Sequence, residues 1–292
     1  MRRIFFILAL LLPALSACGT FDEWQREKVY RPIRIVGDYG LAALRAQYPQ
    51  VQLQQIDEAP GGQLQVLLVP PRGDSGAVPQ HPEIRVLYLH GTGANAWQNM
   101  AKIEGITRNG LEVAAPDYRG WGASSPLLPS EESIHADAWA AWLALQAPAG
   151  QGQGVRWVIY GHSMGSAVAV RLAQRLKEVK PKAYCALVLE SSFTSFPDIA
   201  RSTGTLAGPL LSGLSSQKMA SIERIADVHG PLWMLHGTQD TTVPIELGRR
   251  LYDAAPGPKT WLELPLAHSN LQTDTSGQYD ALWQSVKAAC SR

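Results

Sequence analysis

The chain has 292 residues, of which 46% are hydrophobic and 17% are charged. A chain of this length and composition can bury a large core, which excludes an intrinsically disordered protein and favours one large α/β domain. The formal net charge is +1 at pH 7, so the chain lacks the basic excess of nucleic-acid-binding proteins, and no nucleic acid partner is expected.

The first residues are typical of an export signal. Met1-Arg2-Arg3 is a basic start, and the apolar run 4–12 that follows is too short to span a membrane. The next residues, Leu15-Ser16-Ala17-Cys18, resemble the lipobox of bacterial lipoproteins. The alternative is an ordinary signal peptide whose cleavage happens to leave a cysteine.

The lipobox resemblance implies cleavage before Cys18, a diacylglycerol on its sulfur and usually an N-acyl chain. Two or more acyl chains anchor a protein stably in a membrane. Gly19, rather than an aspartate, follows the cysteine, which favours sorting to the outer membrane. We therefore predict that residues 1–17 are a signal peptide and that the protein is held in the bacterial cell envelope, facing the periplasm.

Beyond Pro49 the apolar patterns of strands and helices alternate along the chain. The first two strands are expected to form an antiparallel hairpin at the edge of a sheet, because Pro60-Gly61-Gly62 separates them. The predicted strands are 52–56, 63–69, 84–90, 111–116, 157–160, 183–189, 232–237 and 260–264. The predicted helices are 38–47, 95–106, 131–146, a helix after Gly165 that ends near 179, 246–254 and 279–289.

The stretch around Ser163 reads as a strand, a sharp turn and a helix. Gly161-His162-Ser163-Met164-Gly165 has the G-x-S-x-G pattern, in which a strained turn projects the serine hydroxyl at the edge of a sheet. The glycines two positions before and after the serine are expected because strand and helix approach closely there. Ser163 is therefore the predicted nucleophile, and the alternative is an ordinary glycine-rich turn with an exposed serine.

A second glycine-rich turn follows the strand 84–90. His90-Gly91-Thr92-Gly93 would let backbone N–H groups point towards a reaction site at the carboxyl ends of the strands. We predict that the backbone N–H groups of Thr92 and Met164 form an oxyanion hole. The alternative is a plain β-turn.

An acid and a base follow the last two predicted strands. Asp240 lies in the loop after 232–237, and His268 lies in the loop after 260–264. In this arrangement His268 takes the proton of Ser163, while Asp240 fixes the tautomer of the imidazole. Asp227 and Asp274 are less well placed alternatives. The remaining histidines, among which His90, His162 and His236 adjoin glycine turns, are expected to be structural.

Three other features have two readings each. Asp117 and Arg119 either bind substrate or form an ion pair that fixes their loop, and the ion pair is favoured. The segment 194–227, which lacks a strand pattern, is either a cap over the site or a pair of surface helices on the sheet edge. An oxidising compartment would permit a disulfide between Cys185 and Cys290, but the sequence leaves their proximity open.

Taken together, these motifs resemble the α/β-hydrolase superfamily, and within it the BEM46 and ABHD13/ABHD17-like group. The resemblance runs from about Ile84 to the C-terminus. It implies a mostly parallel central sheet flanked by helices, with a short cap between the sixth and seventh strands. We accordingly expect a tether and N-terminal extension at 18–50 and an α/β-hydrolase domain at 51–292, with a cap region at 194–227. The motifs are His90-Gly91-Thr92-Gly93, 117–124, Gly161-His162-Ser163-Met164-Gly165, 190–195, 236–240 and 267–270.

The resemblance implies a serine hydrolase that cleaves carboxylic esters or thioesters of small or lipid-like substrates. Two alternatives stay open: a peptidase of the proline-iminopeptidase kind, and a non-catalytic envelope lipoprotein that uses the scaffold for binding. No cofactor is expected, and no spacing of histidines, cysteines and carboxylates predicts a metal site. The sequence indicates nothing about the oligomeric state.

Overall fold

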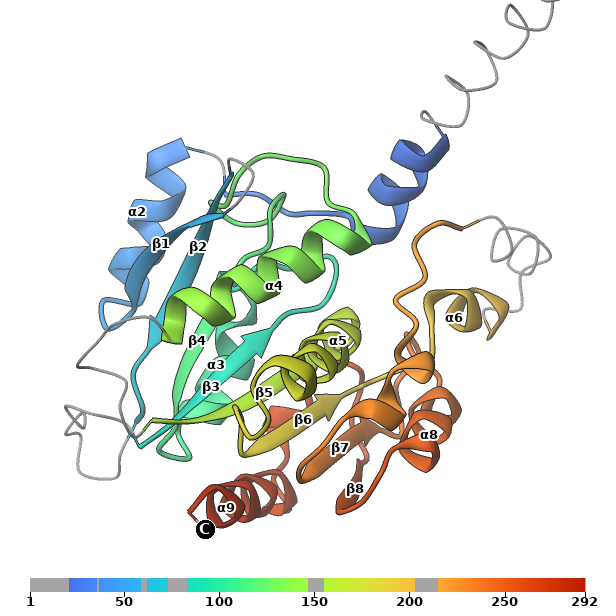
Figure 1. The fold of residues 1–292 in the computed structure, drawn as a ribbon. Helices are drawn as coiled ribbons and strands as arrows, with labels where there is room; N and C mark the ends of the chain where they lie inside the picture. The colour runs from blue at the N-terminus through green and yellow to red at the C-terminus, as the bar shows by residue number, and fades with distance from the viewer. Residues whose placement is uncertain are drawn as a thin grey trace, which may run out of the picture.

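An eight-stranded sheet with the order β1-β2-β4-β3-β5-β6-β7-β8 runs through the described part of the chain (Figure 1). The computed structural model describes residues 21–35, 37–58, 62–72, 83–146, 155–202 and 215–291. The strands are β1 (Gln52–Glu58), β2 (Gly62–Val69), β3 (Ile84–Leu89), β4 (Glu112–Pro116), β5 (Arg156–His162), β6 (Ala186–Glu190), β7 (Leu232–Gly237) and β8 (Lys259–Leu264).

The pairings β1–β2 and β2–β4 are antiparallel, and all pairings from β4 to β8 are parallel. This confirms the predicted edge hairpin and the mostly parallel sheet. Parallel strands end at one edge of a sheet, so the loops after β3, β5, β7 and β8 meet there.

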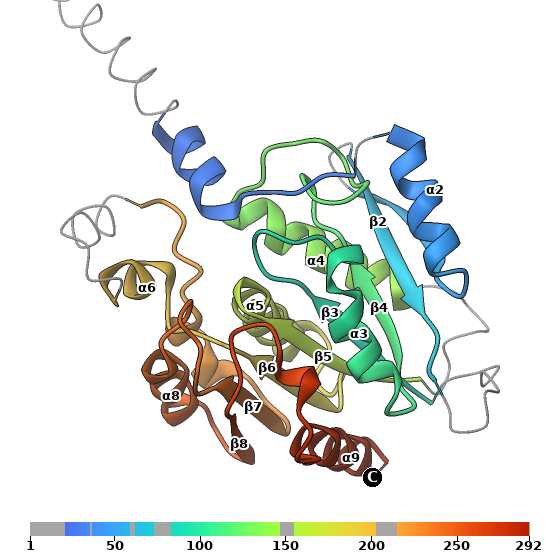
Figure 2. The same ribbon diagram turned by 180° about the vertical axis from the view of Figure 1, so that it is seen from behind.

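Helices cover both faces of the sheet. The helical segments are 21–30, α2 (Gly37–Gln47), α3 (Met100–Thr107), α4 (Glu131–Gln146), α5 (Met164–Val179), α6 (Phe196–Ser202), α8 (Ile245–Ala254) and α9 (Gln278–Cys290), with 3-10 turns η1 (Trp97–Asn99), η2 (Ser221–Glu223), η3 (Ile225–Asp227) and η4 (Leu271–Thr273). The helices α4, α5 and α8 lie on one face, and α2, α3 and α9 lie on the other (Figures 1 and 2).

Two apolar clusters lie between the sheet and these helices, one on each face of the sheet. One joins α4, α5 and α8 to the sheet, with Trp142 and Leu176 among its buried members. The other joins α3 and α9 to the opposite face, with Ile103 and Trp283 among its buried members. The strands β4 and β6 are buried along their whole length, which explains why each is apolar apart from one terminal glutamate.

Several observed boundaries differ from the expected ones. The stretch expected as a helix from 95 begins instead as the 3-10 turn η1 before α3 continues to Thr107. The region expected as a tether and extension contains a helix at 21–30, in which Gln25 and Tyr30 are buried while Phe21 and Trp24 are exposed. A disulfide joins Cys185, which precedes β6, to Cys290 at the end of α9.

The predicted signal peptide at 1–17 and the predicted lipidation site Cys18 lie outside the described residues. Among the helices of the described ranges, none is both long and apolar enough to cross a membrane.

Candidate active site

Ser163 occupies the sharp turn between β5 and α5. Its φ of 55° and ψ of −123° are a strained conformation for a residue with a side chain. A β-carbon at Gly161 would lie 2.3 Å from the carbonyl oxygen of Gly165, and one at Gly165 would lie 1.9 Å from the carbonyl oxygen of Leu89. Neither position has room for a side chain, which confirms the close approach of strand and helix expected from the motif.

The structure brings Asp240 and His268 to Ser163. The Nδ1 atom of His268 lies 2.6 Å from Oδ2 of Asp240, and its Nε2 atom lies 3.0 Å from Oγ of Ser163. The carboxylate can only accept a hydrogen bond, so Nδ1 carries the proton and Nε2 accepts from the serine hydroxyl. The alternative acids lie elsewhere: Asp227 accepts from a glutamine of α5, and Asp274 accepts from the backbone around the start of α9.

The surroundings of Asp240 favour its ionised form. Burial by itself would raise the pKa of Asp240, but hydrogen bonds from His236 and His268 outweigh this and hold the pKa well below its usual value. The backbone N–H groups of Thr242 and Val243 also donate to Oδ1 of Asp240, each at 2.8 Å. A full negative charge therefore faces the imidazole of His268.

Two donors fix the backbone of the loop that carries His268. Nε2 of His162 and Oγ of Ser191 each lie 3.1 Å from the carbonyl oxygen of His268. Burial, together with the charge of Lys102, lowers the pKa of His162 well below its usual value, so its ring is neutral and donates from Nε2. This confirms the structural role expected for His162.

A cavity of about 440 Å³ opens over Ser163 and His268. A β-carbon at Gly91 would lie 3.0 Å from Cβ of Ser163, so the predicted oxyanion loop lies directly against the nucleophile. Met164 is the first residue of α5, where backbone N–H groups have no acceptor within the helix. The remaining lining residues are Arg31, Ile33, Thr92, Gly93, Ala94, Asn99, His162, Thr242 and Ser269.

Arg31 and Ile33 are lining residues that the sequence patterns do not predict, because they precede the first strand and carry no motif. None of the described residues of 194–202 or 215–227 lines this cavity. The cap role of that segment thus stays a prediction. Across the described residues, no group of three or more histidines, cysteines, aspartates and glutamates is arranged to hold a metal ion.

A buried ion pair lies next to the turn of Ser163 and is a second feature that the sequence patterns miss. Lys102 of α3 donates to the carboxylate of Glu190 at the end of β6, and the hydroxyl of Tyr160 donates to the same carboxylate. The backbone oxygen of Glu190 accepts the N–H of Ser163 at 2.9 Å. The sequence feature that could have indicated this pair is Lys102 itself, a lysine among the apolar residues of α3.

Asp117 and Arg119 do not form the expected ion pair with each other. Arg119 pairs with Asp137 of α4, with an Nη2–Oδ1 distance of 2.5 Å. Asp117 instead accepts the backbone N–H of Ala96 at 2.7 Å and lies 3.6 Å from Nε2 of His90. Burial raises the pKa of Asp117 to about 7 and lowers that of His90 to about 4. Both groups are fully buried. The loop is therefore held by contacts of Arg119 with α4 and of Asp117 with Ala96 and His90, and not by one local ion pair.

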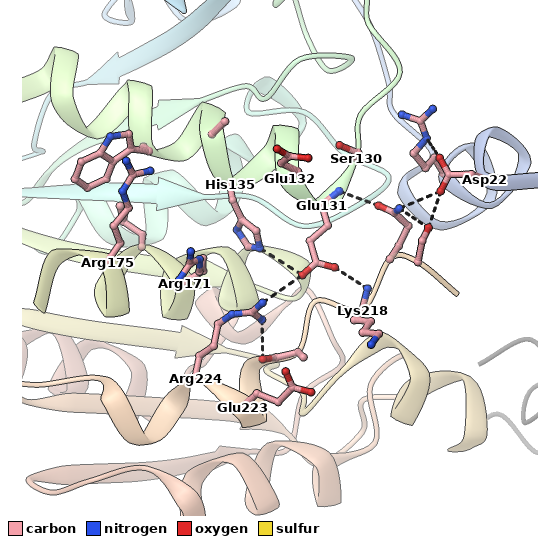
Figure 3. A pocket seen from close by; sticks show the side chains of 17 residues that line it. Asp22, Ser130, Glu131, Glu132, His135, Arg171, Arg175, Lys218, Glu223 and Arg224 are labelled. Carbon is pink, nitrogen blue, oxygen red and sulfur yellow. Dashed lines mark hydrogen bonds and ion pairs between the residues drawn. The ribbon is translucent and has the colours of Figure 1, made fainter. Parts of the chain in front are cut away.

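A second cavity, of about 910 Å³, lies between the helix 21–30, α4, α5 and the segment 215–224 (Figure 3). At its centre, the carboxylate of Glu131 accepts the backbone N–H groups of Lys218 and Met219 at 2.6 and 2.8 Å, and it lies 3.7 Å from His135 and 3.8 Å from Arg224. Burial alone would raise the pKa of Glu131, but hydrogen bonds from His135 and the two backbone groups lower it to about 2.

The lining of this second cavity mixes arginines with carboxylates, as Figure 3 shows, and holds no serine that bonds to a histidine. Gln217 extends the polar contacts: its Oε1 atom accepts from the hydroxyl of Tyr30 at 2.7 Å and from the backbone N–H of Glu131 at 2.8 Å. This cavity therefore marks the junction between the N-terminal helix and α4, and the cavity over Ser163 remains the candidate reaction site.

Comparison with known protein families and sequences finds that the chain is similar to hydrolases. The family model described as "Serine aminopeptidase, S33" matches residues 80–222. An uncharacterised protein of Mycobacterium tuberculosis is 41% identical over 160 residues, covering 53% of this chain and 52% of the relative. The lysophosphatidylserine lipase ABHD12 of Macaca fascicularis is 30% identical over 217 residues, covering 68% of this chain and 52% of the relative. The chain spans about half the length of the curated relatives it matches.

Solved structures agree on the fold. An α/β-hydrolase from Vibrio vulnificus superposes with a TM-score of 0.72 at 18% identity, covering 90% of this chain and 92% of the other. An esterase of Pyrococcus furiosus superposes with a TM-score of 0.67 at 19% identity, covering 88% and 97%. The chain therefore has the α/β-hydrolase fold, as the sequence motifs predicted. The narrower likeness to the BEM46 and ABHD13/ABHD17 group stays a prediction.

Proposed function

We propose that this chain is a serine hydrolase that cleaves carboxylic esters or thioesters through an acyl-enzyme on Ser163. The observation that carries the proposal is the hydrogen-bonded series Asp240–His268–Ser163 at the floor of a cavity, with distances of 2.6 and 3.0 Å. These are the hydrogen-bond lengths that proton transfer from a nucleophile to a general base requires.

In the first half of the reaction, Oγ of Ser163 attacks the carbonyl carbon while its proton passes to Nε2 of His268. Asp240 stabilises the imidazolium that forms, because its carboxylate stays ionised. The tetrahedral intermediate then expels the alcohol or thiol, which takes the proton from His268. In the second half, water attacks the acyl carbon while His268 takes its proton. The bond to Oγ of Ser163 then breaks, the proton passes from His268 to Oγ, and the carboxylic acid is released.

The negative charge that develops on the carbonyl oxygen needs donors aimed at it. We assign this role to the backbone N–H groups of Thr92 and Met164, because the Gly91 loop and the start of α5 both adjoin Ser163. One preorganised donor of this kind is worth about 10²–10³ in kcat.

The test is the hydrolysis of p-nitrophenyl esters of increasing acyl length by the full chain and its Ser163→Ala variant. The parent is expected to turn over at least one ester, and Ser163→Ala to lower kcat by at least about 10³-fold. Ser285→Ala, in α9 and outside the cavity, is the matched control. A fluorophosphonate, which reacts with activated serines, should label the parent and not the Ser163→Ala variant. Equal hydrolysis by parent and variant would contradict the proposal.

The family description also raises an aminopeptidase. A peptidase that holds a free amino terminus needs a carboxylate near the reaction site, whereas no aspartate or glutamate is among the described lining residues of the cavity. Faster release from an aminoacyl p-nitroanilide than from any ester would favour the peptidase. An unlabelled Ser163 would favour a binding protein that has only the scaffold of a hydrolase.

We further propose that the protein is anchored in the envelope of a bacterium, at the outer membrane facing the periplasm, by acyl chains on Cys18. Support comes from the lipobox pattern and from the exposed aromatic side chains of Phe21 and Trp24, which stack on each other in the helix that follows. Cys18→Ser should move the protein from the membrane fraction to the soluble fraction. Unchanged retention would contradict the anchor.

A further inference from the structure

The described lining of the cavity over Ser163 carries a positive charge without a carboxylate. Arg31 is the one arginine or lysine among its described lining residues, and no aspartate or glutamate is among them. The guanidinium has no hydrogen bond or ion pair with any other residue that the structure describes, and Arg31 is exposed. A cation without a counter-charge therefore stands at the rim of the site.

The backbone on both sides of Arg31 is fixed to the domain. Tyr30, immediately before it, is 0% exposed, and its hydroxyl donates to the side chain of Gln217 at 2.7 Å. Two residues after it, the carbonyl oxygen of Ile33 accepts the backbone N–H of Gly122 at 2.9 Å and the side-chain amide of Asn95 at 3.3 Å. Arg31 is thus part of an ordered rim, in which only its side chain is free to meet a ligand.

Arg31 itself has a φ of 45°, in the left-handed region that residues with a side chain seldom adopt. The N–H of Arg31 still donates to the carbonyl oxygen of Glu27 at 3.2 Å, and the helix 21–30 ends here because the left-handed backbone of Arg31 cannot continue it. The chain then turns away from the helix axis and runs along the cavity towards Ile33. Arg31 and Ile33, two residues apart on this segment, both line the cavity.

The guanidinium lies beside the loop that also contacts the nucleophile. A β-carbon at Gly93 would be 3.9 Å from Nη2 of Arg31, and a β-carbon at Gly91 would be 3.0 Å from Cβ of Ser163. The Cα atoms of Gly91 and Gly93 are two residues apart, at most about 7 Å. Ser163 and Arg31 line the same cavity, so a substrate whose carbonyl meets Ser163 can present a second group to Arg31.

We propose that Arg31 is a specificity-determining residue that binds an oxyanion group, a carboxylate or a phosphate, on the substrate ester. The inference rests on the proposed hydrolase function and goes beyond it by stating the charge of the substrate. A guanidinium presents a planar fork of donors that matches both groups in bidentate geometry. No carboxylate of the described lining competes for it, so an anionic substrate gains the interaction without breaking an existing pair.

The test uses two pairs of esters that differ only in charge. Mono-p-nitrophenyl glutarate and its neutral methyl ester place a carboxylate, or none, on the acyl side. An acyl glycerol phosphate and the corresponding acyl glycerol place a phosphate, or none, on the alcohol side. The quantity measured is the ratio of kcat/KM for the anionic ester to kcat/KM for the neutral ester, which cancels any general loss of activity.

Arg31→Gln should lower this ratio by about 10- to 100-fold for at least one pair, mainly through KM, because a charge-assisted hydrogen bond is lost. The ratio for Arg31→Lys should lie between those of Arg31→Gln and the parent, because lysine retains the charge but not the planar pair of donors. Arg34→Gln is the matched control, because Arg34 lies on the same segment but does not line the cavity. Its ratio should equal that of the parent. The pair that responds identifies the anion as carboxylate or phosphate.

Two results would overturn the inference and leave the hydrolase standing. If Arg31→Gln lowers kcat for charged and neutral esters alike, Arg31 supports the site in general and does not select an anion. If the ratio is unchanged in both pairs, Arg31 is a solvated surface residue.

If the parent hydrolyses none of the four esters, the same ratio is measured as the rate of Ser163 labelling by a carboxylate-bearing and a neutral fluorophosphonate. An Arg31-dependent preference for the charged reagent supports the inference, and no preference rejects it. Complete absence of labelling rejects the proposed function, and the inference with it.

Discussion

The buried ion pair between Lys102 and Glu190 allows a sharp test of how the nucleophile is supported. The side chains of Lys102 and Glu190 are 3% and 0% exposed. Tyr160 also donates to the carboxylate, and Lys102 reaches the side-chain oxygen of Gln272 at 3.2 Å. Because the backbone of Glu190 accepts the N–H of Ser163, a disturbance of this pair reaches the end of the strand beside the nucleophile.

The perturbation is Lys102→Met, which removes the ammonium group and keeps a side chain of similar length. Glu190 is then a buried carboxylate without its counter-charge, which costs about 3–5 kcal/mol. The total free energy of unfolding of a domain is about 5–15 kcal/mol, so a large share is lost. For a domain of this size we expect the melting temperature to fall by about 6–20 °C.

The double variant measures the interaction between Lys102 and Glu190 apart from the effects of each single substitution. Glu190→Gln alone leaves Lys102 buried and charged, so it should destabilise by a similar amount. In Lys102→Met/Glu190→Gln both charges are gone, and the glutamine oxygen still accepts from Tyr160. The double variant should therefore be at least about 2 kcal/mol more stable than the sum of the single effects predicts. Urea unfolding at pH 7, followed by tryptophan fluorescence, measures all four proteins.

Lys177→Met is the matched control, because Lys177 pairs with Asp227 at the surface, at 3.7 Å and with side chains 49% and 52% exposed. That change should cost less than about 1 kcal/mol. Two results would refute the reasoning: a Lys102→Met effect no larger than that of the control, or single effects that add up to the effect of the double variant.

Three further predictions concern charge and cross-linking, each measured by urea unfolding. Glu131→Gln should destabilise by about 2–3 kcal/mol at neutral pH, because the carboxylate accepts two backbone N–H groups. The pKa of Glu131 is lowered from 4.5 to about 2, so this difference is present above pH 4.5 and fades as the pH falls towards 2. The pKa of Asp117 is raised by burial from 3.8 to about 7, so its stabilising contribution is full below pH 3.8 and is lost as the pH rises through 7. Because of Asp117, the free energy of unfolding of the parent should fall by about 2–3 kcal/mol between about pH 5 and pH 8. The Asp117→Asn variant should not show this fall. Removing the bridge between Cys185 and Cys290, 105 residues apart, should cost up to about 4–5 kcal/mol.

Each of these has its own control. For Glu131, Glu132→Gln on the same helical turn should show no comparable change with pH, and an equal loss at pH 2 and pH 7 would contradict the ionised form. For Asp117, parallel pH dependences of parent and variant would contradict the raised pKa. For the bridge, Cys290→Ala alone should match the double cysteine variant, and dithiothreitol should have no further effect on either.

The parts of the site that could be predicted from the sequence are those whose signal is local. Ser163 lies in a turn whose strain and close packing demand glycine at two fixed positions, and such a demand is visible within five residues. Asp240 and His268 were predictable for a related reason: each follows a strand, and parallel strands deliver their following loops to one edge of the sheet. The strand pattern alone therefore brings together three residues that are distant in the chain.

Interactions between side chains of different elements could not be predicted in this way. The loop of Arg119 was located correctly, yet its partner Asp137 projects from α4, and the register of a helix against a loop is a property of the packed structure. The pairing of Cys185 with Cys290 was left open for the same reason. Lys102 was missed because a lysine is expected at the surface, where it can be solvated, unless a buried partner is known.

The rim of the cavity has the weakest sequence signal, and it is where substrate choice resides. Catalytic groups must meet strict distances, so few sequences satisfy them and the pattern is recognisable. A rim residue must only place a side chain of the right charge at the cavity, and many different sequences and chain segments can do this. Arg31 reaches the site from a segment that precedes the first strand and is fixed there by Tyr30 and Ile33. The same fold can therefore keep its chemistry while this segment changes, and the charge at position 31 is the feature to compare when substrates of such hydrolases differ.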